Sequence, residues 1–132
     1  MQHFVVYHNP DIMGYPIIDV ERLAIYTNKQ RNDAKGGRVW LITGEGKPRS
    51  FKLRLTFIVQ AVERSDRPEF KARVTGKEGH LFHPMLAIDT TSWFPQLKKR
   101  QGNFAFGFQP VNDPVAESGL LALYRAALLA AK

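Results

Sequence analysis

The sequence of 132 residues contains no cysteine. This absence excludes disulfide frameworks, catalytic thiolates and the zinc sites that need thiolate ligands. Histidines and carboxylates remain as metal ligands, but the closest histidine pair, His80 and His83, adjoins Pro84, which disfavours a helix that would place both on one face. The sequence therefore predicts no metal site and no cofactor.

Long hydrophobic runs are missing as well. Residues 1–7 contain no basic segment leading into an extended apolar stretch, and no apolar run approaches the ~20 residues that span a bilayer. The sequence predicts no membrane partner and a cytoplasmic location.

Acidic residues are scarce relative to basic ones. Twelve Asp and Glu stand against nineteen Lys and Arg, which gives a net charge of +7 and a pI near 9.9. A surplus of this size favours association with anionic partners, and nucleic acid is the first candidate.

Motifs of catalysis are also absent. The chain has no GxSxG sequence, and residues 44–47 (Gly-Glu-Gly-Lys) lack the spacing of a phosphate-binding loop. The sequence therefore indicates a protein that is not an enzyme, although a small-molecule enzyme with a barrel pocket stays open as an alternative.

What the chain does contain is a series of strand patterns. Its length is that of a single domain, which we expect to cover residues 1–132. The long segment 50–63 alternates with a period of two and is expected to end buried on both faces. Strands are predicted over residues 4–7, 38–43, 50–63 and 70–75, with a turn at 76–79. Residues 23–27 fit a strand or a single helical turn, and a strand is favoured.

The remaining third of the chain mixes helix and strand signals. Asp89 to Ser92 predict the N-terminal cap of a short helix that carries Trp93 and Phe94. Residues 102–109 predict a last strand with Phe104, Phe106 and Phe108 on one face. The predicted class is α+β, mostly β, as a barrel with peripheral helices.

A C-terminal helix is predicted from Pro114, with Asp113 as its cap. Its apolar residues recur at helical spacing and are Leu120, Leu121, Tyr124, Ala127, Leu128 and Ala131. This face either packs on the domain itself or docks on a partner or a second copy, which makes an interaction or oligomerisation module the second functional hypothesis.

Several of these segments together resemble the PUA-like superfamily, and within it the EVE domains and the modified-base readers of bacterial restriction nucleases. The segments are residues 7–10 (Tyr-His-Asn-Pro), 37–42, 51–63, Trp93-Phe94 and 102–104 (Gly-Asn-Phe). The resemblance covers residues 1–112 and leaves out 113–132. It implies a pseudobarrel whose pocket takes a natural or modified base extruded from DNA or RNA, with any effector on a separate protein.

Reading a base needs stacking walls, polar groups for the base edge and cations for the phosphates. The candidates for the base pocket are Tyr7, His8, Asn9, Tyr15, Trp93, Phe94 and Asn103. The candidates for phosphate contacts are Lys47, Arg49, Lys71, Arg73, Lys98, Lys99 and Arg100. The alternative interpretation assigns the aromatic residues to the core and the cations to solvated faces.

Overall fold

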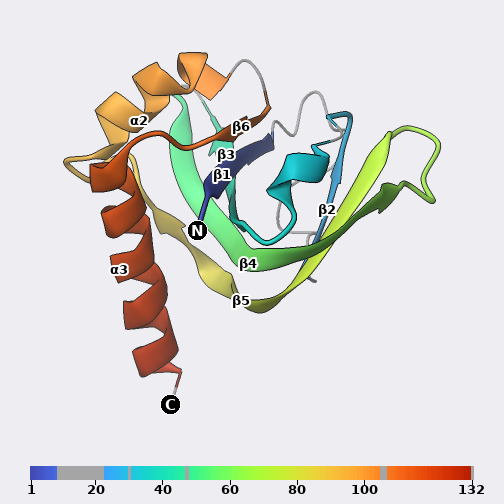
Figure 1. Ribbon diagram of the computed structural model, residues 1–132. Coiled ribbons are helices and arrows are strands. Elements are labelled where there is room, and N and C mark those ends of the chain that lie inside the picture. The colour runs from blue at the N-terminus through green and yellow to red at the C-terminus, as the bar shows by residue number, and fades with distance from the viewer. Residues whose placement is uncertain (9–22, 30, 47, 105–106, 132) are drawn as a thin grey trace.

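The protein is built on one six-stranded sheet with the strand order β2-β5-β4-β3-β1-β6. A computed structural model describes residues 1–8, 23–29, 31–46, 48–104 and 107–131. The strands are β1 (His3–His8), β2 (Ala24–Thr27), β3 (Arg38–Glu45), β4 (Ser50–Arg64), β5 (Ala72–Ala87) and β6 (Phe108–Pro110). β1 and β3 are parallel, and the other neighbours are antiparallel. The α+β, mostly β class is confirmed, with the sheet curled into half a barrel (Figure 1).

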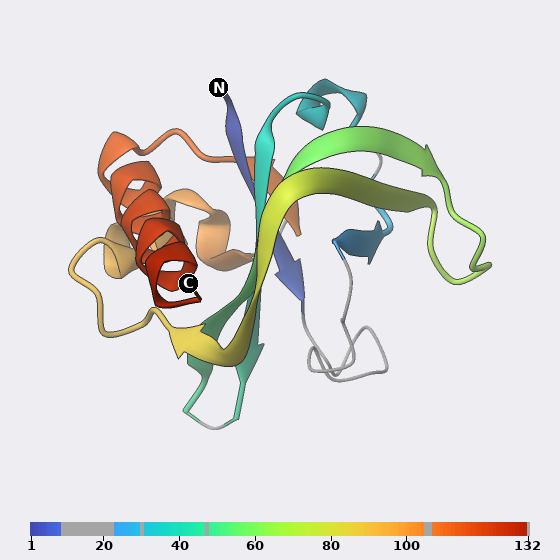
Figure 2. The same cartoon turned by 90° about the horizontal axis from the view of Figure 1, so that it is seen from below.

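The curl comes from the two longest strands, β4 and β5, which arch over β2 (Figure 2). Their register shifts at three places, between Leu53 and Leu55, between Thr56 and Ile58, and between Val59 and Ala61. Such bulges bend a strand and increase its twist. The sequence pattern could not show these shifts, because alternation continues on either side of each one.

The turn predicted at residues 76–79 is wrong, since β5 runs through this segment. A Cβ on Gly76 would collide with the carbonyl oxygen of Ile58, and one on Gly79 with that of Thr56. These glycines therefore serve the close approach of two backbones at the bend and do not reverse the chain.

Side chains alternate between two cores, one on each face of the sheet. Val5, Trp40 and Ile42 belong to the helix-side core, whereas Phe4 and Leu41 belong to the inner core within the curl. The predicted burial of the end of 50–63 is also wrong. That end carries the exposed Gln60, Glu63 and Arg64, and together with the loop to β5 it projects as an arm (Figure 2).

Two α-helices among the described residues cover the outer face of the sheet, α2 (Phe94–Arg100) and α3 (Pro114–Ala130). As predicted, Asp113 caps α3, with its Oδ1 accepting from the amide of Ala116 at 3.2 Å. The apolar face of α3 packs into the helix-side core, where Leu120 is fully buried. The prediction that this face packs on the domain itself is confirmed for Leu120, Leu121, Tyr124 and Ala127, whereas Leu128 and Ala131 are exposed. Neither helix combines the length and apolarity needed to cross a membrane.

Two local predictions for residues 89–109 are wrong. The cap of α2 is Trp93, without a side-chain hydrogen bond, because Asp89 accepts from the amide of Phe51 at 3.2 Å and so anchors the start of β4. The predicted strand 102–109 is a 3₁₀ turn, η3 (Gly102–Phe104), followed later by β6. Phe104 joins the helix-side core, Phe108 joins the inner core, and Phe106 lies outside the described residues.

Candidate functional site at the hairpin end

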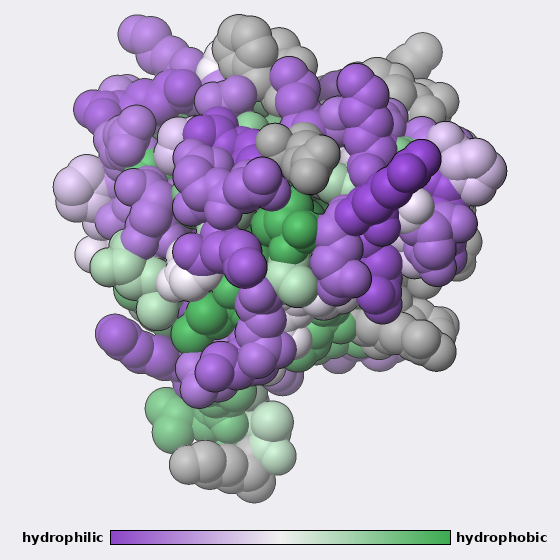
Figure 3. All heavy atoms as spheres, turned by 45° about the vertical axis from the view of Figure 1, so that its right-hand side comes forward, coloured by the Kyte–Doolittle hydropathy of each residue, from purple (hydrophilic) through white to green (hydrophobic). Residues whose placement is uncertain are grey.

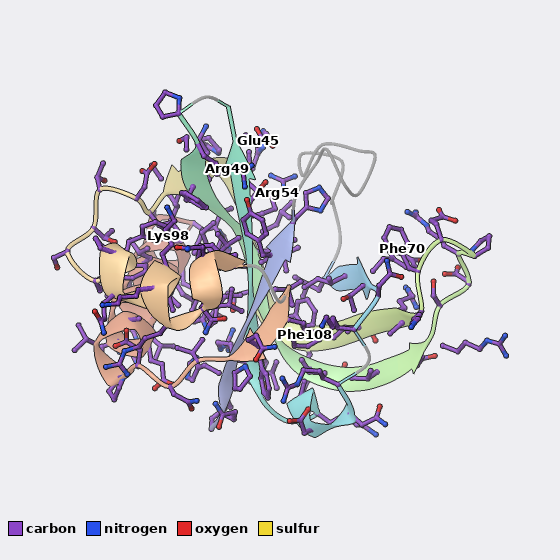
Figure 4. All side chains as sticks on the ribbon, turned by 90° about the horizontal axis from the view of Figure 1, so that it is seen from above. Glu45, Arg49, Arg54, Phe70, Lys98 and Phe108 are labelled. Carbon is purple, nitrogen blue, oxygen red and sulfur yellow. The ribbon has the colours of Figure 1, made fainter. Side chains whose placement is uncertain are left out.

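The sequence-predicted side chains converge best where β1 and β3 end and β4 begins. We call this region the hairpin end, after the β3–β4 hairpin. Figure 4 shows Glu45, Arg49 and Arg54 at this end, and Phe70 at the opposite end of the sheet. The hairpin end has an aromatic side, which faces α2, and a polar side, which faces the inner core.

The aromatic side consists of four rings from four elements. Tyr7 stacks on Phe104 with the ring centroids 5.1 Å apart and the planes 8° apart. The ring centroid of Phe51 lies 5.1 Å from that of Phe94 and 5.6 Å from that of Phe104. Phe51, Phe94 and Phe104 are at most 5% exposed, whereas Tyr7 is half-buried. The first three rings fill the core, and Tyr7 leads from them to the surface.

Two cations lie on this aromatic cluster from different elements. Arg49 of the hairpin donates from Nη1 to the hydroxyl of Tyr7 at 3.2 Å. The Nζ of Lys98 on α2 lies 5.0 Å from the ring centroid of Phe51, a cation–π contact. Gly44 makes room for this arrangement, because a Cβ there would collide with the Tyr7 hydroxyl and lie 2.8 Å from the Arg49 Cδ. Both cations are thereby held at the rim of one cluster.

The polar side is formed by His8, Thr43 and Arg54, which are all at most 2% exposed. Alternation along β1 turns His8 to the inner side, and the hydroxyl of its neighbour Thr43 donates to the His8 carbonyl at 3.1 Å. Arg54 lies in a bulge, because its neighbours Leu53 and Leu55 pair with Leu86 and Leu81 of β5. The Nη1 of Arg54 donates to the Phe82 carbonyl at 3.0 Å. His8 and Thr43 are therefore adjacent buried polar residues, and Arg54 is a buried cation of β4 near the same end of the sheet.

Sequence reasoning missed Arg54 and Thr43. Alternation in 50–63 placed Arg54 with Lys52 on an exposed face, but the bulge between Leu53 and Leu55 turns Arg54 inward. No signal in the sequence marks a bulge at this position, so a buried arginine could not be foreseen.

The base-pocket candidates do not form one slot. Tyr7 and His8 lie at the hairpin end on opposite faces of β1, and Phe94 is buried in the helix-side core. Trp93 packs on α3, where its ring lies against Gly119. Asn103 is exposed in η3, with a left-handed backbone (φ 57°). Asn9 and Tyr15 lie outside the described residues.

The phosphate-contact candidates fall into two groups. Arg49 and Lys98 lie at the hairpin end, and Lys99 and Arg100 continue α2 as exposed residues, with Arg100 bound to the Asn112 carbonyl at 2.8 Å. Lys47 lies outside the described residues. Lys71 and Arg73 lie at the far end of the sheet, so the predicted cations do not share one surface.

The far end has its own contacts between polar and aromatic residues. The Tyr26 hydroxyl donates to Asp66 at 2.8 Å, and this hydrogen bond lowers the pKa of the Asp66 carboxyl. The guanidinium of Arg67 lies 4.3 Å from the Tyr26 ring centroid. These contacts hold the tip of the β4–β5 arm on β2.

A second group of buried polar side chains lies under α3. Trp40 donates from Nε1 to Nδ1 of His3 at 2.9 Å. Arg38 donates to Thr56 at 3.2 Å and to the Glu78 carbonyl at 3.1 Å, and its guanidinium lies 4.6 Å from the centroid of Tyr124. Burial, then the charges of Arg38 and of the α-amino group, lower the pKa of His3. These partners all belong to the sheet and α3, so this cluster fastens the helix.

Chemically, the hairpin end offers two cations and a partly exposed phenol beside buried polar side chains. Within the described part of the chain, no three His, Asp or Glu side chains gather closely enough to hold a metal ion. The arrangement suits an anionic ligand with a polar, ring-bearing part. In comparisons with known proteins, no family model and no curated protein matches this chain.

Proposed function

We propose that this protein is a non-catalytic nucleic-acid-binding domain that uses the hairpin end. The observation that carries the proposal is the placement of Arg49 and Lys98 on one aromatic cluster from two different elements. The only ion pair between described residues joins Arg31 and Asp33, far along the chain from either cation. Arg49 and Lys98 are therefore available to phosphates.

The phosphate contacts supply affinity in this proposal. Each phosphate that a cation neutralises releases condensed counterions, which makes binding depend on salt. Lys99 and Arg100 extend the cationic rim along α2, and the net charge of +7 favours approach to a polyanion. Such contacts position the nucleic acid and carry no sequence information.

The base would be read beside the C-terminal end of β1. Tyr7 presents a partly exposed ring on one face of β1, and the buried His8 lies on the other face. The curled sheet supports the resemblance to a PUA-like pseudobarrel of the EVE type. The proposal further includes a ligand with a natural or modified base, a cytoplasmic location and an effector on a separate protein.

The test is a fluorescence-polarisation titration of the chain with DNA and RNA oligonucleotides at several salt concentrations. The oligonucleotides are made with cytosine, 5-methylcytosine or 5-hydroxymethylcytosine. Binding at low salt that prefers one base form supports a reader. Equal affinity for every base form contradicts base reading and leaves backbone binding, and no binding at low salt contradicts the whole proposal.

The variant R49Q/K98Q tests where the nucleic acid binds. It should reduce the magnitude of the negative slope of log K against log salt by about 1.4–1.8. Two phosphate contacts are lost, and each contributes ~0.7 with single strands or ~0.9 with duplex DNA. The matched control R64Q/K71Q removes two exposed cations from the far end and should leave the slope unchanged. An equal fall in both variants would mean that the hairpin end has no special role.

A further inference from the structure

The outward face of α3 differs from the rest of the surface in carrying almost no charge. Charged residues form 23% of the chain, yet Glu117 and Arg125 are the only two among the 17 residues of α3. On the side away from the sheet, Val115 and Leu129 are 67% and 70% exposed. The last turns of α3 extend beyond the sheet (Figure 1) and form a hydrophobic projection on the surface (Figure 3).

The spacing of these residues forms a seam. Val115, Ala122 and Leu129 recur every seven residues, which places them along one line of the helix. Ser118 and Ala126 flank this line, and all five side chains are exposed. The seam has large side chains at its two ends and small ones at its middle. It lies opposite the face that packs on the sheet.

We propose that this seam is a self-association surface, on which α3 of a second copy packs antiparallel about a two-fold axis at Ala122. In that arrangement Val115 of each copy meets Leu129 of the other. The small Ala122 side chains meet at the axis, where the helices come closest. Such an interface is isologous, because both copies use the same patch.

A second copy fits this face better than another partner does, because side-chain sizes follow the same order in both directions from Ala122: a small residue four positions away (Ser118, Ala126) and a large apolar one seven positions away (Val115, Leu129). Helical geometry also sets Arg125 beside Ser118 of the second copy, whose hydroxyl can accept from the guanidinium. Each Arg125 lies three residues from the two-fold axis, on opposite sides of it. At a rise of 1.5 Å per residue the two side chains are about 9 Å apart along the helices, so they do not oppose each other. Nucleic acid would need cations, and among the exposed residues of α3 only Arg125 is one.

The expected association is weak. A helix of 17 residues is about 25 Å long, and one face of it is small beside the ~1,600 Å² of a standard interface. We therefore expect a monomer–dimer equilibrium that shifts with protein concentration, rather than a permanent dimer. This inference does not depend on nucleic-acid binding.

Sedimentation velocity of the full 132-residue chain over a wide concentration range tests the proposal. The wild type should show a dimer that grows with concentration. A122E should raise the dissociation constant at least tenfold, because two carboxylates would meet at the axis. The matched control A87E changes another exposed alanine, at the end of β5, and should dimerise like the wild type. A wild type that stays monomeric, or a dimer that A122E leaves intact, overturns the proposal.

Two further variants test the geometry. A mixture of A122E and A122K should dimerise although each alone does not, because position 122 faces its own counterpart. The chain has no cysteine of its own, so V115C and L129C proteins mixed under oxidation should form the mixed disulfide in preference to either homodimer. Preferred homodimers of V115C would mean parallel helices and would overturn the antiparallel arrangement.

Discussion

Replacing Gly119 with alanine sets two opposing effects against each other. Glycine inside a helix is less favourable than alanine by roughly 1 kcal/mol, so the change should stabilise an exposed helix. At Gly119, however, a Cβ would lie 2.6 Å from Cε2 of Trp93 and would collide with its Nε1. Carbon atoms in contact are normally ~3.5–4.0 Å apart.

The collision should win. Relieving it requires the Trp93 ring or α3 to move by about 1 Å, and α3 is held by the fully buried Leu120. Overpacking of this kind costs about 1–3 kcal/mol. Subtracting the gain in helix propensity leaves a net loss of about 1 kcal/mol in the free energy of unfolding.

Trp93→Ala removes the obstacle, so in that background G119A should stabilise the protein by about 1 kcal/mol. The change in sign amounts to a coupling of about 2 kcal/mol between the two positions. Urea unfolding followed by far-ultraviolet circular dichroism measures it without relying on tryptophan fluorescence. Equal stabilisation by G119A in both backgrounds would refute the packing of Trp93 on α3 and would return Trp93 to the candidates for base stacking.

Three other changes test the remaining contacts. Burial lowers the pKa of His3, so as the pH falls the unfolded state binds a proton before the folded state does. The contribution of His3 to stability should therefore be complete above pH ~6.5 and decline below it. Urea unfolding near pH 7.5 and 5.5 should show a smaller decline in H3Q than in the wild type. Asp113→Ala removes the cap of α3 and should lower the free energy of unfolding by about 1 kcal/mol, and an unchanged thermal midpoint would speak against this cap. Tyr124→Phe keeps the ring over Arg38 but loses the hydrogen bond to the Glu78 carbonyl (3.1 Å), for a loss of about 1 kcal/mol; Tyr124→Leu should lose more, and equal losses would mean that the ring contributes nothing.

The sequence predicted those elements whose signals are local. Strand patterns before residue 64 located β1 to β4 to within a few residues, and Asp113 with Pro114 located the start of α3. It failed where tertiary contacts decide. Gly76 and Gly79 look like turn residues, yet their lack of a side chain allows the backbones of the paired strands β4 and β5 to approach closely.

For the candidate site, the sequence identified the end of β1 and the cations of α2 but not how they combine. Tyr7 and Lys98 meet through Phe51, a residue that sequence reasoning assigned only to a strand. Trp93 is a residue type that often stacks on bases, but its ring packs against Gly119 of α3, which lies 26 positions later in the sequence. Contacts between residues so distant in sequence leave no local pattern, so they could not be predicted.

The position of β1 in the sheet has a consequence for how the chain folds. β1 lies between β3 and β6, and its Phe4 pairs with Val39 on one side and with Pro110 on the other. During synthesis at about 5–20 residues per second, β1 emerges first but waits for β6 for roughly 5–20 s. The β3–β4–β5 meander, whose pairings are between successive strands, can form in the meantime. For that interval one edge of β1, whose central Phe4, Val5 and Val6 are apolar, lacks its final neighbour, which makes the nascent chain most prone to aggregation before residue 110 is reached.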